Sequence, residues 1–206
     1  NGKTSIAFYL KSIWKAANIS SATIGTLGVI YANKKIPLNL TTPDPITLHK
    51  CIDNLKTKGI KNIALEASSH GIEQNRIDAI RINRAVFSNF SRDHLDYHKT
   101  LEDYFKAKKR LFSEILAIRG IAIVNNACKY GKKIESFCKR KKIKVITYGT
   151  NKSDWQINKI IFKNSYSLVS VSILGKLYFF KCRLFAYYQI ENLVCSMLIA
   201  YSYNVS

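Results

Sequence analysis

Short apolar runs alternate along the 206-residue chain with amphipathic stretches of helical length. Residues 4–17 follow a glycine-containing turn, and residues 129–141 form a second amphipathic stretch, so we predict a helix over each. Thr100 is a typical helix N-cap because Asp103 lies three positions after it. We expect the helix that begins there to continue to about residue 118.

Runs rich in apolar and β-branched residues between these helices predict strands. The first four predicted strands are residues 61–66, 84–89, 120–125 and 144–148. Strands that alternate with helices of ten or more residues are typical of a parallel sheet covered by helices on both faces. The pattern therefore predicts an α/β fold with a mostly parallel, doubly wound sheet.

The pattern changes after Trp155. Three consecutive strands are predicted over residues 155–163, 167–174 and 176–183. Gly175 lies where a hairpin turn is needed, which indicates a small antiparallel group of strands. Residues 191–203 predict a closing apolar helix, and since no linker or repeat interrupts the chain, we expect one domain over residues 1–206.

The composition fits a globular protein, with 47% hydrophobic and 22% charged residues. No apolar run is long enough to span a bilayer and the N-terminus does not resemble a signal peptide, so we expect a cytoplasmic protein. The five cysteines form no C-x-x-C pair, which favours reduced thiols over disulfides or a metal site.

The net charge of +20 raises the alternative of a basic nucleic-acid-binding module. The densest basic stretch, KKIESFCKRKKIK at residues 132–144, contains one aromatic residue and no base-reading pattern. A solvated helix face accounts for such a stretch, so we expect no nucleic-acid partner.

The first five residues, Asn1, Gly2, Lys3, Thr4 and Ser5, look like the second half of a phosphate-binding loop. In such a loop a glycine lets the backbone approach the phosphates, a lysine neutralises them and a hydroxyl holds magnesium. The first glycine of the loop and the strand before it are missing. That strand normally lies inside the sheet, so we expect a truncated chain with unpaired backbone where it would pair.

Polar segments follow the predicted strands, at the sheet edge where ligands of such folds bind. Glu66 opens the segment EASSHGIEQNR at residues 66–76. Two more segments are SRDHLDYH at residues 91–98 and YFKAKKRL at residues 104–111.

Together with NGKTS at residues 1–5 and LTTPDP at residues 40–45, these segments resemble the ATP-binding domain of the Mur ligase family in order and spacing. The stretch S-S-H-G-x-x-x-x-R, taken with T-T-P, is most similar to the members that form the tripeptide precursor of peptidoglycan. A folylpolyglutamate synthase-like ligase, which has a related ATPase domain, is the alternative within this fold.

The resemblance implies a P-loop-type fold and a ligase that uses ATP and Mg²⁺. ATP phosphorylates the terminal carboxylate of UDP-N-acetylmuramoyl-L-alanyl-D-glutamate, and the amine of a diamino acid then attacks the acyl phosphate. Lys3 matches the residue that contacts the outer phosphates, and residues 1–5 together match the nucleotide-binding loop. The positions that match metal ligands are Thr4, Glu66, His94 and Lys108, and Lys108 matches a lysine that is carbamylated in the family.

The resemblance also implies contacts with the substrates. The positions that match contacts to the nucleotide-sugar peptide are Thr41, Thr42, Ser68, Gln74 and Arg76. Asn192 matches a position near the nucleotide base, whereas His70 and His98 are expected to be structural. The segment LTTPDP favours diaminopimelate over lysine as the added amino acid.

The chain departs from the family pattern at several places. Ala127 and Cys128 stand where the family usually has two aspartates, and Ala186 stands in place of a glycine. The resemblance further implies that an N-terminal uridine-binding domain and a C-terminal amino-acid-binding domain lie outside this chain. We expect residues 1–206 alone to be inactive.

Overall fold

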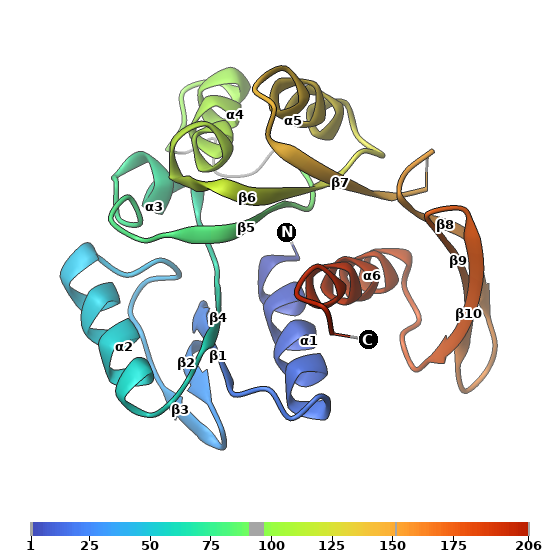
Figure 1. Ribbon diagram of the computed structural model, residues 1–206, viewed down its shortest axis with the longest axis horizontal. Coiled ribbons are helices and arrows are strands. Elements are labelled where there is room, and N and C mark those ends of the chain that lie inside the picture. The colour runs from blue at the N-terminus through green and yellow to red at the C-terminus, as the bar shows by residue number, and fades with distance from the viewer. Residues whose placement is uncertain (1, 91–96, 151, 206) are drawn as a thin grey trace.

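The computed structural model describes residues 2–90, 97–150 and 152–205. Within these residues the strands form two sheets (Figure 1). One has four strands in the order β3-β2-β1-β4, and the other has six in the order β10-β9-β8-β7-β6-β5. Helices pack on both sides of the strands, as the sequence pattern predicted.

The four-stranded sheet contains three strands that the sequence analysis did not predict. Its strands are β1 (Ser21–Gly25), β2 (Gly28–Tyr31), β3 (Lys34–Ile36) and β4 (Asn62–Leu65). β1 runs parallel to β4, whereas β1, β2 and β3 are joined as antiparallel hairpins. β1 is buried at every position, so it lacks the alternation that marks a half-exposed strand.

The unpredicted helix α2 (Pro45–Thr57) follows this sheet. Its start carries two recognisable signals: Pro45 is at the first helical position, and the Asp44 carboxylate accepts a hydrogen bond from the Thr47 amide at 3.0 Å.

The six-stranded sheet joins the parallel and antiparallel groups that the sequence predicted separately. Its strands are β5 (Ile82–Phe87), β6 (Leu116–Asn125), β7 (Lys144–Gly149), β8 (Trp155–Phe162), β9 (Ser167–Ile173) and β10 (Lys176–Cys182). β5 to β8 pair in parallel, and β8 to β10 pair antiparallel. Leu174 and Gly175 have φ values of 48° and 87°, which confirms the predicted hairpin turn.

Side chains of β6 alternate between two hydrophobic cores. Ile121 and Ile123 pack with α1 (Lys3–Ala16) and α6 (Tyr187–Tyr201). Ala122 and Val124 pack in the second core, with α4 (Leu101–Arg110) and α5 (Lys129–Arg140). In Figure 1, α1 and α6 therefore lie on the inner side of the molecule, and α4 and α5 lie on its outer surface.

The prediction of a helix that begins at Thr100 is confirmed at the start of the helix and wrong at its end. The Thr100 hydroxyl accepts a hydrogen bond from the Asp103 amide at 3.1 Å. The α-helix stops at Arg110, a single π-helical turn, η1 (Leu111–Ile115), follows, and β6 begins at Leu116. Leu116 pairs with Ile82 of β5, so a long-range strand contact overrides the apolar period that favoured helix.

β4 and β5 each end a sheet and line the same cavity of about 390 Å³. Side chains of α1, including Ile6, Leu10 and Trp14, close one side of this cavity. Each of the two strands has a hydrogen-bonded neighbour on one side only within the described residues. Both are therefore edge strands in the part of the chain that the structure describes.

β10 forms the other end of the six-stranded sheet. Leu177, Tyr178 and Phe179 are all exposed on it, and Lys176 and Lys181 flank these apolar residues. Among the described residues, this edge therefore presents apolar side chains beside backbone groups that have no strand partner.

All five cysteines are free thiols. Burial raises the pKa of Cys138 to about 11 and that of Cys195 to about 12, so both stay protonated at neutral pH.

Among the described helices, none has the length and apolarity needed to cross a bilayer.

Hydrogen exchange tests the unpaired edges. Amides of β4 and β5 that point into the shared cavity should exchange faster than amides of β6, because β6 is bonded to strands on both sides. Residue-resolved exchange measured by NMR provides the comparison. Equal protection along both edges of β5 would contradict the arrangement.

Glu191, in the first half of α6, gives a pH-dependent prediction. Burial raises the pKa of its carboxyl group, so the folded state holds the proton more tightly than the unfolded state. Stability from this group is present at acid pH and is lost as pH rises through the raised pKa. Glu191→Gln should therefore raise Tm at pH 7 and change it little below about pH 4. The exposed change Asp53→Asn is the control, and a Tm gain that persists unchanged in acid would refute the assignment.

Candidate functional site

The start of α1 forms one wall of the candidate site. Gly2 precedes the helix with φ 89°, and no side chain caps the helix there. A Cβ on Gly2 would lie 2.6 Å from the Asn192 Oδ1 atom of α6, so glycine is needed for conformation and for space. Lys3 and Ser5 lie half-buried in the first turn. Uncapped N–H groups with a neighbouring lysine suit a phosphate group.

Glu66 lies at the centre of the site, directly after β4. It is 5% exposed, and its carboxylate accepts hydrogen bonds from the Thr4 hydroxyl at 2.8 Å, the Thr26 amide at 3.1 Å and the Thr26 hydroxyl at 3.1 Å. Gly25 ends β1 beside it, and a Cβ there would overlap the carboxylate. The ends of β1, β4 and α1 are thus held together by one buried acid.

A second group of hydrogen bonds begins one residue away. Thr42 is 1% exposed, and its hydroxyl donates to the Glu66 carbonyl at 2.8 Å and accepts the Ser68 amide at 2.9 Å. The Ser68 hydroxyl accepts the Gly71 amide at 3.0 Å, which caps the short helix α3 (Ser69–Glu73). Thr41 is half-buried, and its hydroxyl is 3.1 Å from that of Thr26.

Arg76 and Gln74 extend this group toward the surface. The Arg76 Nη1 atom donates to the Thr42 carbonyl at 2.7 Å, and its Nε atom donates to the Gln74 Oε1 atom at 3.0 Å. Gln74 is exposed, and its amide donates to the Tyr97 hydroxyl at 3.1 Å. The structure therefore brings the five predicted substrate positions into one network with Glu66.

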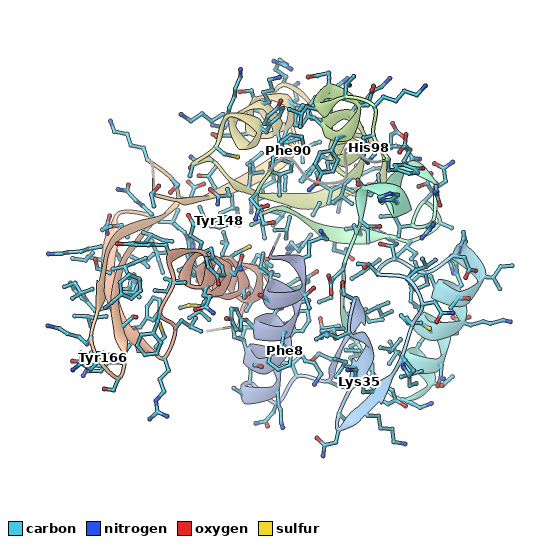
Figure 2. All side chains as sticks on the ribbon, turned by 180° about the vertical axis from the view of Figure 1, so that it is seen from behind. Phe8, Lys35, Phe90, His98, Tyr148 and Tyr166 are labelled. Carbon is cyan, nitrogen blue, oxygen red and sulfur yellow. The ribbon has the colours of Figure 1, made fainter. Side chains whose placement is uncertain are left out.

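Lys108 lies on α4, in a separate set of contacts. Its Nζ atom is 4.8 Å from the centre of the Tyr104 ring and 5.8 Å from that of Phe90. Figure 2 shows Phe90 on the side of the molecule that carries α4 and α5. The aromatic rings hold the half-buried lysine in a defined position.

The contacts of His98 agree with the structural role expected for it. It is 2% exposed, and its Nδ1 atom is 3.4 Å from the Glu73 Oε2 atom. Its ring centre is 5.0 Å from that of Tyr104 and 5.7 Å from that of His70 (Figure 2 labels His98). The ring thus packs between α3 and α4.

The oxygen atoms around Glu66 suit magnesium. Thr4, Thr26 and Glu66 supply two hydroxyl groups and a carboxylate, and Mg²⁺ prefers oxygen ligands and keeps several waters. The described residues contain no group of three His, Cys, Asp or Glu side chains that would form a site by themselves. His94 and Asn1, two of the predicted site residues, lie outside the described residues.

Gly25 and Thr26 belong to this site, although the sequence analysis did not identify them. The signal available was a Gly-Thr pair directly after an apolar run, which is common in turns and was not distinctive.

Two departures from the family pattern also have a structural account. The Cys128 Sγ atom accepts the Gly131 amide at 3.3 Å and so caps α5, and Ala186 has φ −136°, which any residue adopts.

Comparisons with known proteins agree with this geometry. The Mur ligase middle domain matches residues 1–200. The UDP-N-acetylmuramoyl-L-alanyl-D-glutamate–2,6-diaminopimelate ligase of Anaplasma marginale is 36% identical over 203 residues, which are 97% of this chain and 42% of the relative. The ligase of the same name from Bradyrhizobium diazoefficiens is 33% identical over 204 residues, again 97% of this chain and 42% of the relative.

Solved structures show the same relationship. A ligase of the same name has a TM-score of 0.89 and 29% identity, and the match covers 99% of this chain and 42% of that one. The MurF ligase of Thermotoga maritima, in complex with ADP, shares the fold with a TM-score of 0.78 at 16% identity, over 99% of this chain and 44% of that one. This chain spans less than half the length of these relatives. Because the Mur ligase middle domain matches residues 1–200 of the 206-residue chain, the chain belongs to the Mur ligase family.

Proposed function

We propose that residues 1–206 are the central ATP-binding domain of a ligase that joins 2,6-diaminopimelate to UDP-N-acetylmuramoyl-L-alanyl-D-glutamate. The observation that carries the proposal is the buried Glu66 carboxylate bonded to Thr4 at the start of α1. The names of the relatives support the choice of substrates. The small-molecule substrates and ATP favour a cytoplasmic reaction.

In this proposal, ATP binds with its phosphates at the start of α1. Gly2 allows close approach, the Lys3 ammonium group neutralises the outer phosphates, and residues 1–5 form the loop around them. Asn192 lies beside Gly2 and is buried, which supports a contact between its amide and the nucleotide. The MurF relative was solved in complex with ADP, which supports ATP as the nucleotide of this proposal.

The proposed metal ligands are Thr4, Glu66, His94 and a carbamylated Lys108. Carbamylation would turn the Lys108 ammonium group into an anion with oxygen donors, which suits magnesium. The cation–π contacts with Tyr104 and Phe90 would then be lost, so the modified side chain would depend on the metal for its position. Bound magnesium would supply positive charge to the transferring phosphoryl group.

The Thr42–Arg76 network is the proposed site for the peptide part of the substrate. Arg76 is the cation of this network and Gln74 its exposed amide, so both suit an anionic substrate. Thr41 and Ser68 present hydroxyl groups beside them, whereas the buried Thr42 holds Ser68 and Arg76 in place.

The reaction then has two steps. A carboxylate oxygen of the D-glutamate attacks the γ-phosphorus atom of ATP, which forms an acyl phosphate and releases ADP. The diaminopimelate amine attacks the carbonyl carbon, and phosphate leaves with the bonding electrons of the C–O bond. The nitrogen loses a proton as the amide bond forms. Lys3 and Arg76 would offset the repulsion between two anions, ATP and the D-glutamate carboxylate, and hold them in line for the attack.

An assay of the full-length protein tests this function. Continued ADP release over many turnovers should require both UDP-N-acetylmuramoyl-L-alanyl-D-glutamate and diaminopimelate, and Lys3→Ala should lower turnover by about a hundredfold or more because the phosphates lose their cation. Lys15→Ala, at the exposed end of the same helix, is the matched control. Turnover with a folate and glutamate instead, or equal activity of the two variants, would overturn the proposal.

Gly25→Ala tests the role of Glu66. The new methyl group would displace the carboxylate, so binding of Mg²⁺ and ATP should weaken at least tenfold, as measured by calorimetry, and stability should fall by about 1–3 kcal/mol. Gly59→Asn is the control, since the position has open space and a left-handed conformation that asparagine tolerates. Unchanged nucleotide affinity in Gly25→Ala would show that Glu66 takes no part in binding.

A further inference from the structure

Residues of α4 and α5 line a second concave site. The two helices lie on the outer surface of the molecule (Figure 1). The groove encloses about 600 Å³. Its lining contains the five cationic side chains of Lys109, Lys129, Lys132, Lys133 and Arg140 and a single carboxylate, Glu102. None of these residues belongs to the network around Glu66 and Arg76.

Two of the lysines are held in position by aromatic rings. The Lys109 Nζ atom is 4.3 Å from the centre of the Phe137 ring. The Lys133 Nζ atom is 5.0 Å from the ring centre of Tyr130 and 5.4 Å from that of Phe105. Because cation–π contacts restrict these flexible side chains, part of the ordering cost of binding an anion is already met.

The positive charge of the groove is poorly neutralised. Glu102 is 3.8 Å from Lys133, and its side chain is 73% exposed, so this ion pair is weak. Glu135, the acid on α5, instead pairs with Lys139 at 2.6 Å, and neither residue lines the groove. Lys129, Lys132 and Lys133 lie within one helical turn, where like charges repel one another.

The shape of the site narrows the class of ligand. A bilayer surface is flat and would meet only the rims of a groove, whereas a small ligand can enter it. Phe105 and Phe137 are only 5% and 9% exposed beneath the lysines, so the groove offers no open ring for stacking a nucleic-acid base. Recognition there depends on charge, and lysine ammonium groups bind phosphate as point charges.

We propose that this groove binds a linear oligophosphate chain of about three phosphates, at a site separate from the proposed ATP site at the start of α1. Five cations against one carboxylate leave a net charge of +4, close to that which a triphosphate neutralises. The chain could be free oligophosphate or the phosphate tail of a nucleotide. The proposal does not depend on the ligase activity.

The test is a calorimetric titration of the protein with sodium tripolyphosphate in metal-free, low-salt buffer. The protein carries Lys3→Ala, which silences the proposed ATP site. The groove variant adds Lys109→Gln, Lys132→Gln and Lys133→Gln. The control variant instead adds Lys34→Gln, Lys35→Gln and Lys50→Gln, which are exposed on β3 and α2 and remove the same charge.

We expect saturable binding that weakens at least tenfold in the groove variant and no more than twofold in the control. NMR shifts on adding tripolyphosphate should centre on α4 and α5. Titration with ATP distinguishes the two sources. Tighter binding of ATP than of tripolyphosphate would identify a nucleotide as the ligand, and weaker binding of ATP would identify free oligophosphate. If the triple variant folds poorly, the single changes at the exposed Lys132 and the half-buried Lys109, Lys132→Gln and Lys109→Gln, should show the same trend.

Equal weakening in both triple variants would overturn the proposal, because binding would then follow overall charge. So would the absence of saturable binding. Stronger binding to a single-stranded oligonucleotide or to phosphatidylserine vesicles than to tripolyphosphate would assign the basic face to one of those partners instead.

Discussion

The buried carboxylate of Glu66 is the constraint on which the candidate site depends. Its three hydrogen bonds join α1 through Thr4 and the turn after β1 through Thr26. The Glu66 carbonyl accepts the Thr42 hydroxyl, so the loop that carries Thr42 is fixed to the same residue. A buried carboxylate without donors would be costly, and the surrounding chain is arranged to supply them. Gly25 completes the arrangement by leaving room for the side chain.

Features set by neighbouring residues could be predicted from the sequence. The Thr100 cap, the turn at Gly175 and the alternation of strands and helices all depend on local chemistry. The end of α4 could not be predicted, because Leu116 is drawn into a strand by Ile82, which lies far away in the sequence. β1, β2 and β3 have five, four and three residues, too few to show a period.

The candidate site shows the same division. Glu66 and Arg76 were identified because they belong to long, distinctive segments, whereas Thr26 was missed because two residues carry little information. Burial of Thr42 could not be predicted either, since a threonine in the loop between a strand and a helix is usually exposed. The capping role of Cys128 was also hidden, because sulfur is a weak acceptor and cysteine is an uncommon cap.

The open edge of β10 has a consequence for how copies of this chain behave together. The apolar residues between Lys176 and Lys181 form a strand that another copy could extend, and such edges seed assembly. The two lysines act as gatekeepers, since apposed strands would bring ammonium groups close together. That protection is electrostatic and is screened at high ionic strength. The resistance of the β10 edge to pairing with another copy should therefore fall as the salt concentration rises.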